Sequence, residues 1–289
     1  MKAHPVTWAA RLLWLVIPFT TGDALGRALA THSRPVQVTV TIGAWALWAA
    51  LAIALLIPAP ATLTVVRIGV PAAALVASWA TWRSDGTATG VAGLVVALVA
   101  GALAITGYVG DDFVDGASYG DERRFTLRAP AVLLLGPIPL AWLAVVTGTV
   151  AGPLLLAARQ WVAGAVAIAA GGILVWFGSR SLHTLATRFA VFVPAGFTLV
   201  DPLTLVDSIL FPVRRIISFG PALADAEGER LDLSQQALGL ALELGLDSPV
   251  ELTVKRARRR AEDVRASRIL LNPARPAAVI AEARRRNIG

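Results

Sequence analysis

The residue types that most often carry chemistry are scarce in this chain of 289 residues. It has no cysteine, which excludes disulfides, thiolate metal sites and cysteine nucleophiles. Its three histidines, His4, His32 and His183, lie far apart, so a histidine-based site would have to gather them from different segments. The sequence contains no nucleophile elbow, phosphate-binding loop or dinucleotide fingerprint. We therefore predict no catalytic residue, no metal site and no cofactor, and we expect that the protein is not an enzyme.

What remains is positive charge, and its densest run is KRARRR near the C-terminus. The run contributes Lys255, Arg256, Arg258, Arg259 and Arg260. It could be a solvated strand end or loop, or it could contact anionic lipid, since each basic charge near such a surface contributes about 1 kcal/mol. No nucleic-acid-binding module or interleaved aromatic platform accompanies the run. We expect no nucleic-acid partner.

A second basic pair lies in the polar segment GDDFVDGASYGDERRFTLRA, residues 110–129. We expect Arg123 and Arg124 to pair locally with Asp121, with Glu122 or with lipid phosphate. The segment could also dock on the C-terminal part of the chain. Both arginines are therefore candidates for contact with the membrane surface or with a partner.

Arg67 is the one charge a few residues inside a long apolar stretch. Charges within a membrane span are costly and often functional, so Arg67 could bind an anion or take part in gating. Alternatively, its side chain could extend to the interface, as arginines near helix ends do. We treat Arg67 as a possible intramembrane functional residue.

The residues named above lie in two parts of the chain that differ in composition. The whole chain is 56% hydrophobic and only 16% charged, whereas soluble domains carry about 25% charged residues. Residues 1–179 hold ten of the 26 Lys and Arg residues and seven of the 19 Asp and Glu residues. We predict a helical transmembrane domain over residues 1–180 and a cytoplasmic β-rich domain over residues 181–289.

Apolar stretches of about 20 residues are long enough to cross a bilayer as helices. We expect about six, of which the first is the least apolar: 6–25, 38–57, 62–82, 90–109, and two within 131–177. The turn between the last two could lie at Gly152–Pro153 or at Arg159–Gln160, and we favour Arg159–Gln160 after a long, proline-kinked fifth helix. The alternating run VQVTVTI, residues 36–42, leads into an unbroken apolar stretch, so we assign it to a helix.

Basic residues in short loops indicate orientation, because they favour the cytoplasmic side. With the N-terminus inside, the inner side carries eight such residues: Lys2, Arg11, Arg67, Arg123, Arg124, Arg128, Arg180 and Arg188. The outer side carries four: Arg27, Arg34, Arg83 and Arg159. We predict a multi-pass protein of the plasma membrane with both termini in the cytoplasm.

The C-terminal part changes to a strand pattern. Short apolar runs bounded by turn residues predict a mostly antiparallel sheet, with strands over 189–193, 197–200, 208–211, 214–219, 250–255 and 268–271. The first two strands and the turn Pro194–Gly196 between them predict a β-hairpin. A terminal helix is expected over 276–286, because Pro276 suits a first helical turn. Residues 233–246, LSQQALGLALELGL, have a helix-like pattern.

Two resemblances accompany this pattern. ATRFAVFVPAGFTLVD (186–201), ILFPVRRIISF (209–219) and ILLNPARPAAVIAEARRR (269–286) resemble the bacterial pleckstrin-homology-like (PH-like) domain that often follows membrane helices. TLTVVRIGVPAA (62–73), GASYGDERRFTLRAP (116–130) and FVPAGFTLVDP (192–202) are similar to a family of uncharacterised actinobacterial multi-pass membrane proteins. The resemblances imply an α+β domain behind a helical bundle and no particular activity.

We expect a non-enzymatic integral membrane protein that anchors a cytoplasmic interaction or scaffold module. Its partners would be the lipid bilayer, a protein or further copies of itself, and anionic lipid. The alternative is a transporter- or channel-like protein with a regulatory cytoplasmic tail. An arginine inside a span favours the alternative, whereas the absence of Asp or Glu from the middle of the predicted spans argues against coupled transport.

Overall fold

A computed structural model describes residues 3–222, 230–255 and 261–289. The chain divides into two compact units. The first is helical and comprises Met1–Phe113 and Pro139–His183. The second comprises Val114–Ile138 and Thr184–Gly289 and is rich in strands. The second unit therefore draws on two separate parts of the chain, one of them lying between helices in the sequence.

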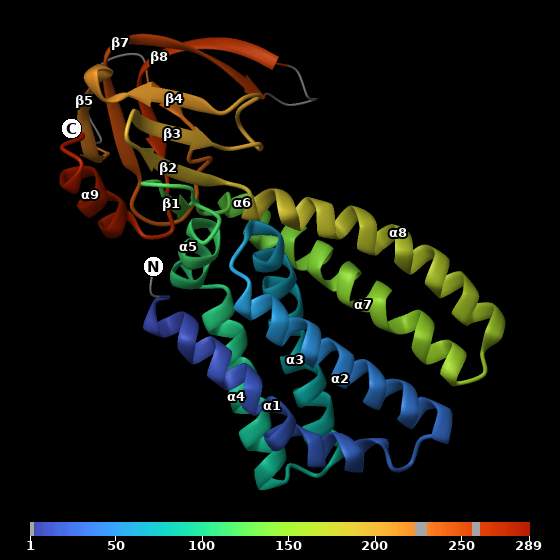
Figure 1. Cartoon of the computed structure of the whole chain (residues 1–289). Helices are drawn as coiled ribbons and strands as arrows, with labels where there is room; N and C mark the ends of the chain where they lie inside the picture. Colours follow the sequence, from blue (N-terminus) through green and yellow to red (C-terminus); the bar gives the residue numbers. More distant parts are fainter. Residues whose placement is uncertain (1–2, 223–229, 256–260) are drawn as a thin grey trace. The chain divides into compact units, whose positions relative to one another are not determined.

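Long helices make up the first unit, and each predicted span coincides with one of them (Figure 1). They are α1 (Pro5–Leu29), α2 (Arg34–Leu56), α3 (Pro60–Arg83), α4 (Ala88–Ala104), α7 (Pro137–Ala157) and α8 (Trp161–Ala186). Proline stands in the first turn of α1, α2 and α3, where a missing N–H costs no helical hydrogen bond. The run VQVTVTI is helical within α2, as predicted.

Among the described residues, four helices are long and apolar enough to cross a membrane: α2, α3, α7 and α8. α4 and the short helix α5 (Gly107–Asp115) pass the same test as a pair that is bent by 57°. α1 has 25 residues but includes Arg11, Asp23 and Arg27, which lower its hydropathy. The helical architecture is confirmed, and the apolar helices are compatible with a membrane protein.

Glycines bring α7 and α8 into close contact. A Cβ atom added to Gly148 would lie 2.9 Å from the carbonyl oxygen of Gly171, and one added to Gly152 would lie 2.5 Å from Ile168. Gly164 is equally close to Leu156. Small residues allow helix backbones to approach in this way, so Gly148 and Gly152 serve the packing of α7 against α8 within the chain. The predicted turn at Arg159–Gln160 joins the two helices, with Arg159 at φ +61°.

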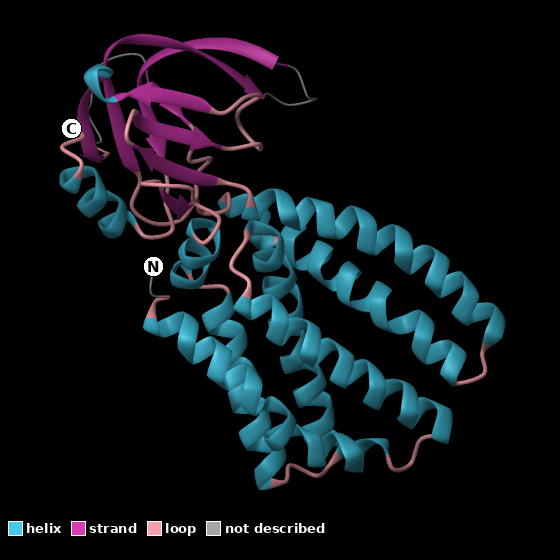
Figure 2. Ribbon diagram, viewed as in Figure 1, coloured by secondary structure: helices cyan, strands magenta, loops and turns pink. Residues whose placement is uncertain are grey.

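The second unit contains two four-stranded sheets in its described residues (Figure 2). The first sheet has the order β1-β2-β3-β4: β1 (Arg123–Thr126), β2 (Phe189–Val193), β3 (Gly196–Val200) and β4 (Ile209–Pro212). The second has the order β5-β7-β8-β6: β5 (Ile216–Pro221), β6 (Arg230–Asp232), β7 (Leu242–Lys255) and β8 (Ala261–Leu271). Every neighbouring pair is antiparallel except β6 with β8. The short helices α6 (Ala131–Leu135) and α9 (Pro276–Arg285) also belong to this unit.

The segment between α5 and α6 docks on the C-terminal part through β1. Arg123 of β1 lies opposite Phe192 of β2, and Thr126 lies opposite Phe189. The docking of this segment was one of the predictions, and the strand pairing confirms it. Phe125 of β1 is 3% exposed, so an apolar side chain from the inter-helix segment is part of the core of the second unit.

One apolar core joins the two sheets. Phe192 and Phe197 of the first sheet make edge-to-face contacts with Phe219 of the second, with ring centroids 5.9 and 5.2 Å apart. Val279 and Ala283 of α9 are buried in the same cluster. At Gly196, φ is +155° and a Cβ atom would lie 2.0 Å from the Phe211 carbonyl oxygen, so only glycine allows β3 to approach β4 here.

The predicted β2–β3 hairpin and the terminal helix are confirmed at nearly the expected bounds. The helical interpretation of residues 233–246 is wrong, since Leu242–Leu246 begin β7 and no helix occurs there. Alternate apolar residues such as Leu242 and Leu244 fit a strand as well as a helix over so short a run. Pairing with β5 and β8 decides for the strand.

Candidate functional site

Polar groups collect at one end of the helical unit. Asp112 of α5 accepts hydrogen bonds from the backbone N–H of His4 (2.7 Å) and from the hydroxyl of Thr7 (2.5 Å). Arg11 of α1 donates from Nε to the carbonyl oxygen of Leu55 in the last turn of α2 (2.9 Å). Positive charge there is favourable, because the last carbonyls of a helix lack intrahelical donors. These bonds join the start of α1 to the ends of α2 and α5.

Arg67 lies at the same end, two turns into α3. Its Nε is buried and makes no hydrogen bond in the described part of the chain, and its charge interacts with that of Asp111. One turn earlier on α3, the hydroxyl of Thr64 lies 2.9 Å from Nδ1 of His183 on α8. Asp111, on a different helix from Arg67, is also buried and is only 4% exposed.

The sequence alone did not identify Asp111, Asp112 or His183 as members of this cluster. Asp111 and Asp112 follow directly after an apolar stretch, which gave them the appearance of residues in a solvated loop. Helix α5 continues past that stretch at an angle and turns both acids toward other helices. In the sequence, the only indication of this cluster is that two acids follow each other at the end of an apolar stretch. Two acids in that position fit a solvated loop as well as a buried cluster.

Arg123 and Arg124 are held by intramolecular pairs within the second unit. Arg123 donates to Asp115 (3.0 Å), and Arg124 donates to Glu122 (2.8 Å). The hydrogen bond from Arg124 lowers the pKa of Glu122 below its ordinary value. Local pairing with Glu122 was predicted and is confirmed. Both arginines remain partly exposed, but these pairs reduce the charge that they present to a partner.

Of the predicted basic run, only Lys255 lies within the described residues. Its Nζ donates to the carbonyl oxygen of Pro202 (2.8 Å), and its backbone N–H bonds to Thr204. Arg256, Arg258, Arg259 and Arg260 lie outside the described residues.

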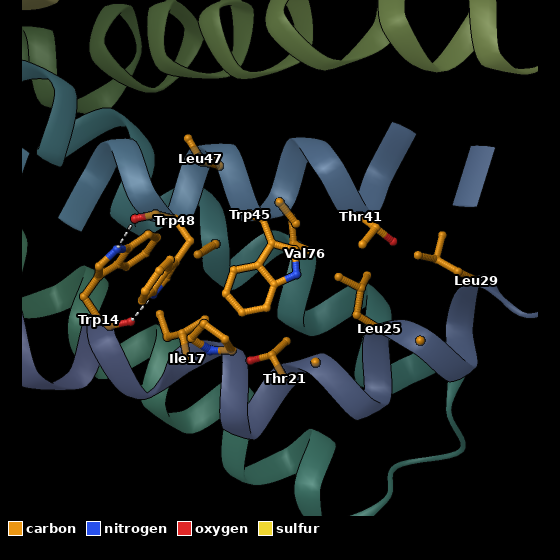
Figure 3. A pocket seen from close by; sticks show the side chains of 15 residues that line it. Trp14, Ile17, Thr21, Leu25, Leu29, Thr41, Trp45, Leu47, Trp48 and Val76 are labelled. Atoms are coloured by element: carbon orange, nitrogen blue, oxygen red, sulfur yellow. Dashed lines mark hydrogen bonds between the residues drawn. The ribbon is translucent and has the colours of Figure 1, made fainter. Parts of the chain in front are cut away.

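A cavity of about 330 Å³ lies between α1, α2 and α3 (Figure 3). Its wall is nearly all apolar, and Ile17, Leu25, Leu47 and Val76 contribute to it. Its remaining lining residues are Trp14, Pro18, Thr21, Gly22, Gly26, Leu29, Thr41, Ala44, Trp45, Trp48 and Ala73. No charged residue is among them.

Two tryptophans close one end of the cavity. The indole N–H of Trp14 donates to the carbonyl oxygen of Trp48 (3.0 Å), and that of Trp48 donates to the carbonyl oxygen of Trp14 (3.1 Å). These are the two dashed lines in Figure 3. Trp45 packs edge-on against Trp48, with ring centroids 5.5 Å apart. The reciprocal bonds fix α1 against α2, with Leu29 and Thr41 at the other end of the cavity.

The two sites differ in what they can do. The Arg67 cluster can hold charge and join helix ends, and within the described residues no group of three His, Asp or Glu side chains could hold a metal ion. The cavity can accept an apolar ligand. Comparison of the chain with protein-family models, with curated proteins and with solved structures gave no match.

Proposed function

We propose that the protein is an integral membrane protein with six spans and both termini in the cytoplasm, and that its helical unit anchors a β-rich, PH-like interaction module in the plasma membrane. The module would bind a protein partner or further copies of the chain and would contact the membrane surface. The protein would act without catalysis.

The observation that carries this proposal is the alternation of the helices. Contacts at one end of the helical unit involve the starts of α1, α3 and α7 and the ends of α2, α5 and α8. At the other end, Arg27 near the end of α1 lies beside Thr87 and Thr89 at the start of α4. Six helices of alternating direction support six crossings, with both chain termini on one side.

The module would be anchored at several points. Residues 114–138 leave α5 and re-enter α7, and residues from 184 onward leave α8. These segments fold into one unit through the β1–β2 pairing. Only two residues separate the end of α8 from β2. Short connections of this kind support a module held close to the membrane, in contrast to one on a long flexible linker.

Exposed apolar side chains of the second unit supply two candidate surfaces. The first lies at the turn from β4 to β5, where Leu210 is 47% exposed and Ile217 is 65% exposed. We propose it for the protein partner. The second comprises α6 and the loop before β7, where Leu135, Leu238 and Leu240 are exposed. We propose it for the membrane surface, because Leu135 stands two residues before the span α7 and Arg128 donates to the carbonyl oxygen of Leu238 (3.0 Å).

Matched surface variants test the module. The full chain would be purified from native membranes after chemical cross-linking, alongside Leu210→Ser with Ile217→Ser and, as a control, Leu238→Ser with Leu240→Ser. We expect one partner, cross-linked at β4–β5, to be lost from the first variant and retained by the second. Equal recovery in all three proteins would count against a partner surface at this position. Deleting the C-terminal part is a poorer test, because it would expose Phe125 of β1.

A transporter- or channel-like protein is the second candidate, and the buried charges of Arg67 and Asp111 favour it. Buried charges near a span end can hold an ion or couple helix movements. We expect Arg67→Gln to leave insertion and partner recovery unchanged if the protein is an anchor. Loss of a cellular phenotype with normal membrane levels of the variant would favour the second candidate.

A further inference from the structure

We infer that the cavity between α1, α2 and α3 is a binding site for one acyl chain of a phospholipid from the outer leaflet. The inference rests on the proposed membrane placement and extends it to a specific lipid site. It depends on the depth, wall and size of the cavity, and on open space beside two glycines.

The cavity lies at the depth of acyl chains. Its lining residues on α2 run from Thr41 to Trp48. At 1.5 Å per residue they stand about 10 and 21 Å from the start of that helix at Arg34, within a hydrocarbon core of about 30 Å. In the proposed topology the α1–α2 connection is outside, so an acyl chain would enter near Leu29 and end against the Trp14–Trp48 pair.

Polar atoms contribute little to the lining, and the hydroxyl oxygen of Thr21 is buried without a hydrogen-bond partner among the described residues. Both indole N–H groups of Trp14 and Trp48 are bonded to carbonyl oxygens. The hydroxyl of Thr21 lies against Gly93 of α4, since a Cβ atom at Gly93 would be 2.7 Å from it. Cavities with apolar walls stay dry and bind apolar molecules. The surrounding bilayer supplies such molecules as acyl chains.

The volume of about 330 Å³ suits a hydrocarbon chain. An apolar cavity of about 150 Å³ is enough for benzene, so this one has roughly twice that space.

Two glycines leave part of the cavity open on α1. A Cβ atom at Gly22 or Gly26 would meet nothing within 4 Å. Small residues at a four-residue spacing normally allow another helix to approach, yet no described helix lies against these two. Leucine at either position would project into the cavity without a backbone clash. Gly43 of α2 also has open space but is not part of the lining.

These glycines allow a matched test. The full chain, Gly26→Leu, Gly22→Leu and the control Gly43→Leu would be reconstituted in phosphatidylcholine nanodiscs that contain a phospholipid with a photoreactive diazirine on its acyl chain. Cross-linked residues would be mapped by peptide mass spectrometry. We expect labelling at the buried lining residues Trp14 and Leu29 to exceed that at the exposed Ile53, and to fall at least threefold in Gly26→Leu and Gly22→Leu but not in Gly43→Leu.

Equal labelling of Trp14 in all four proteins, or no excess over Ile53 in the unmodified chain, would overturn the site and leave only general lipid contact. A second experiment, extraction of native membranes with alkaline carbonate, shows whether the acyl-chain site alone has failed or the proposed membrane function has failed as well. Release from the membrane would overturn both proposals. Retention in the membrane with unchanged labelling would overturn the acyl-chain site alone.

Discussion

At the scale of single residues, one buried arginine of the second unit holds three segments together. Arg188 is 2% exposed and donates to both carboxylate oxygens of Asp201, at 2.7 and 2.8 Å. Its third bond goes to the carbonyl oxygen of Arg128 (2.8 Å). Arg188 thus joins the start of β2, the end of β3 and the segment after β1. The sequence counted it as a loop charge that sets orientation, whereas in the fold it is a buried ion-pair member.

We predict that Arg188→Met destabilises the second unit by about 3–5 kcal/mol, because Asp201 would remain as a buried and unpaired charge. Urea-dependent proteolysis of the full-length protein in detergent would measure the change. Arg215→Met, which removes a solvent-exposed pair with Asp247, serves as the control and should leave the midpoint unchanged. Similar midpoints for both variants would show that the Arg188–Asp201 pair contributes little to stability.

Glu282 of α9 makes the second unit sensitive to acid. Burial alone would raise its pKa, but hydrogen bonds and charge from Arg285 and Arg286 outweigh burial and lower it. A lowered folded-state pKa contributes stability above the unfolded value of about 4.3, and this is lost as pH falls through the folded pKa. Arg286 also donates to the carbonyl oxygen of Asp121 (2.8 Å). The Glu282–Arg286 ion pair therefore helps to hold residues 116–122 against α9.

We therefore expect the unmodified protein to lose thermal stability below about pH 4 more steeply than Glu282→Gln, which cannot titrate. Unfolding would be followed between neutral and acidic pH by circular dichroism of the full chain. Glu262→Gln, which changes an exposed carboxylate on β8, is the matched control. If Glu282→Gln and Glu262→Gln show the same pH dependence, Glu282 does not link acidity to stability.

At the scale of elements, the backbones of α7 and α8 are in close contact. Gly171 faces Gly148 so closely that a Cβ atom would lie 2.4 Å from its carbonyl oxygen. The next residue, Gly172, has nothing within 4 Å. Adjacent glycines on one helix thus differ completely in what surrounds them, and only one of them permits the helix contact.

This difference predicts opposite outcomes for the same substitution. Gly171→Leu should force α7 and α8 apart and cost at least about 1–3 kcal/mol through overpacking. Gly172→Leu should be neutral or slightly stabilising, because glycine is a poor helix former. The aggregation temperature of the detergent-solubilised protein measures both. A larger loss for Gly172→Leu would contradict the observed helix contact.

At the scale of the whole molecule, two features limit how the chain can cross a membrane. The helices alternate in direction, and the second unit is built from two separate parts of the chain. Residues 114–138 and 184–289 fold as one unit, so they must lie on the same side of any membrane that the helices cross. An even number of crossings between them, by α7 and α8, satisfies this requirement. Charge counting alone had indicated the same arrangement with only a modest excess of basic residues on one side.

The absence of cysteine permits a direct test of topology. We expect single cysteines at Ala117 and Ala277, both exposed in the second unit, to react with an impermeant maleimide only after the cells are opened. Cysteines at Ala88 and Ala158, both exposed near helix ends, should react in intact cells. Reaction of Ala158 from the same side as Ala117 would mean that α7 and α8 do not cross, and it would overturn the six-span arrangement.

The sequence by itself determined the features that depend on local pattern. Apolar stretches of sufficient length, prolines at helix starts and the turn at Pro194–Gly196 identify their elements because each acts within a few residues. The positions of the six long helices, the β2–β3 hairpin and α9 follow from such signals. The wrong prediction of a helix over residues 233–246 shows where such local patterns fail, because a short apolar pattern fits the period of a helix and that of a strand equally well.

Only the tertiary structure decided which distant segments meet. β1 gains its partner strand more than 60 residues later in the chain, and Arg188 gains its buried environment from the same arrangement. Asp111 lies at the end of the helical unit that holds Arg67 because α5 bends after α4. The cavity exists because Trp14 and Trp48 fix two helices while Gly22 and Gly26 leave space between them. Such contacts depend on packing and strand pairing across long sequence separations, which no local pattern of residues encodes.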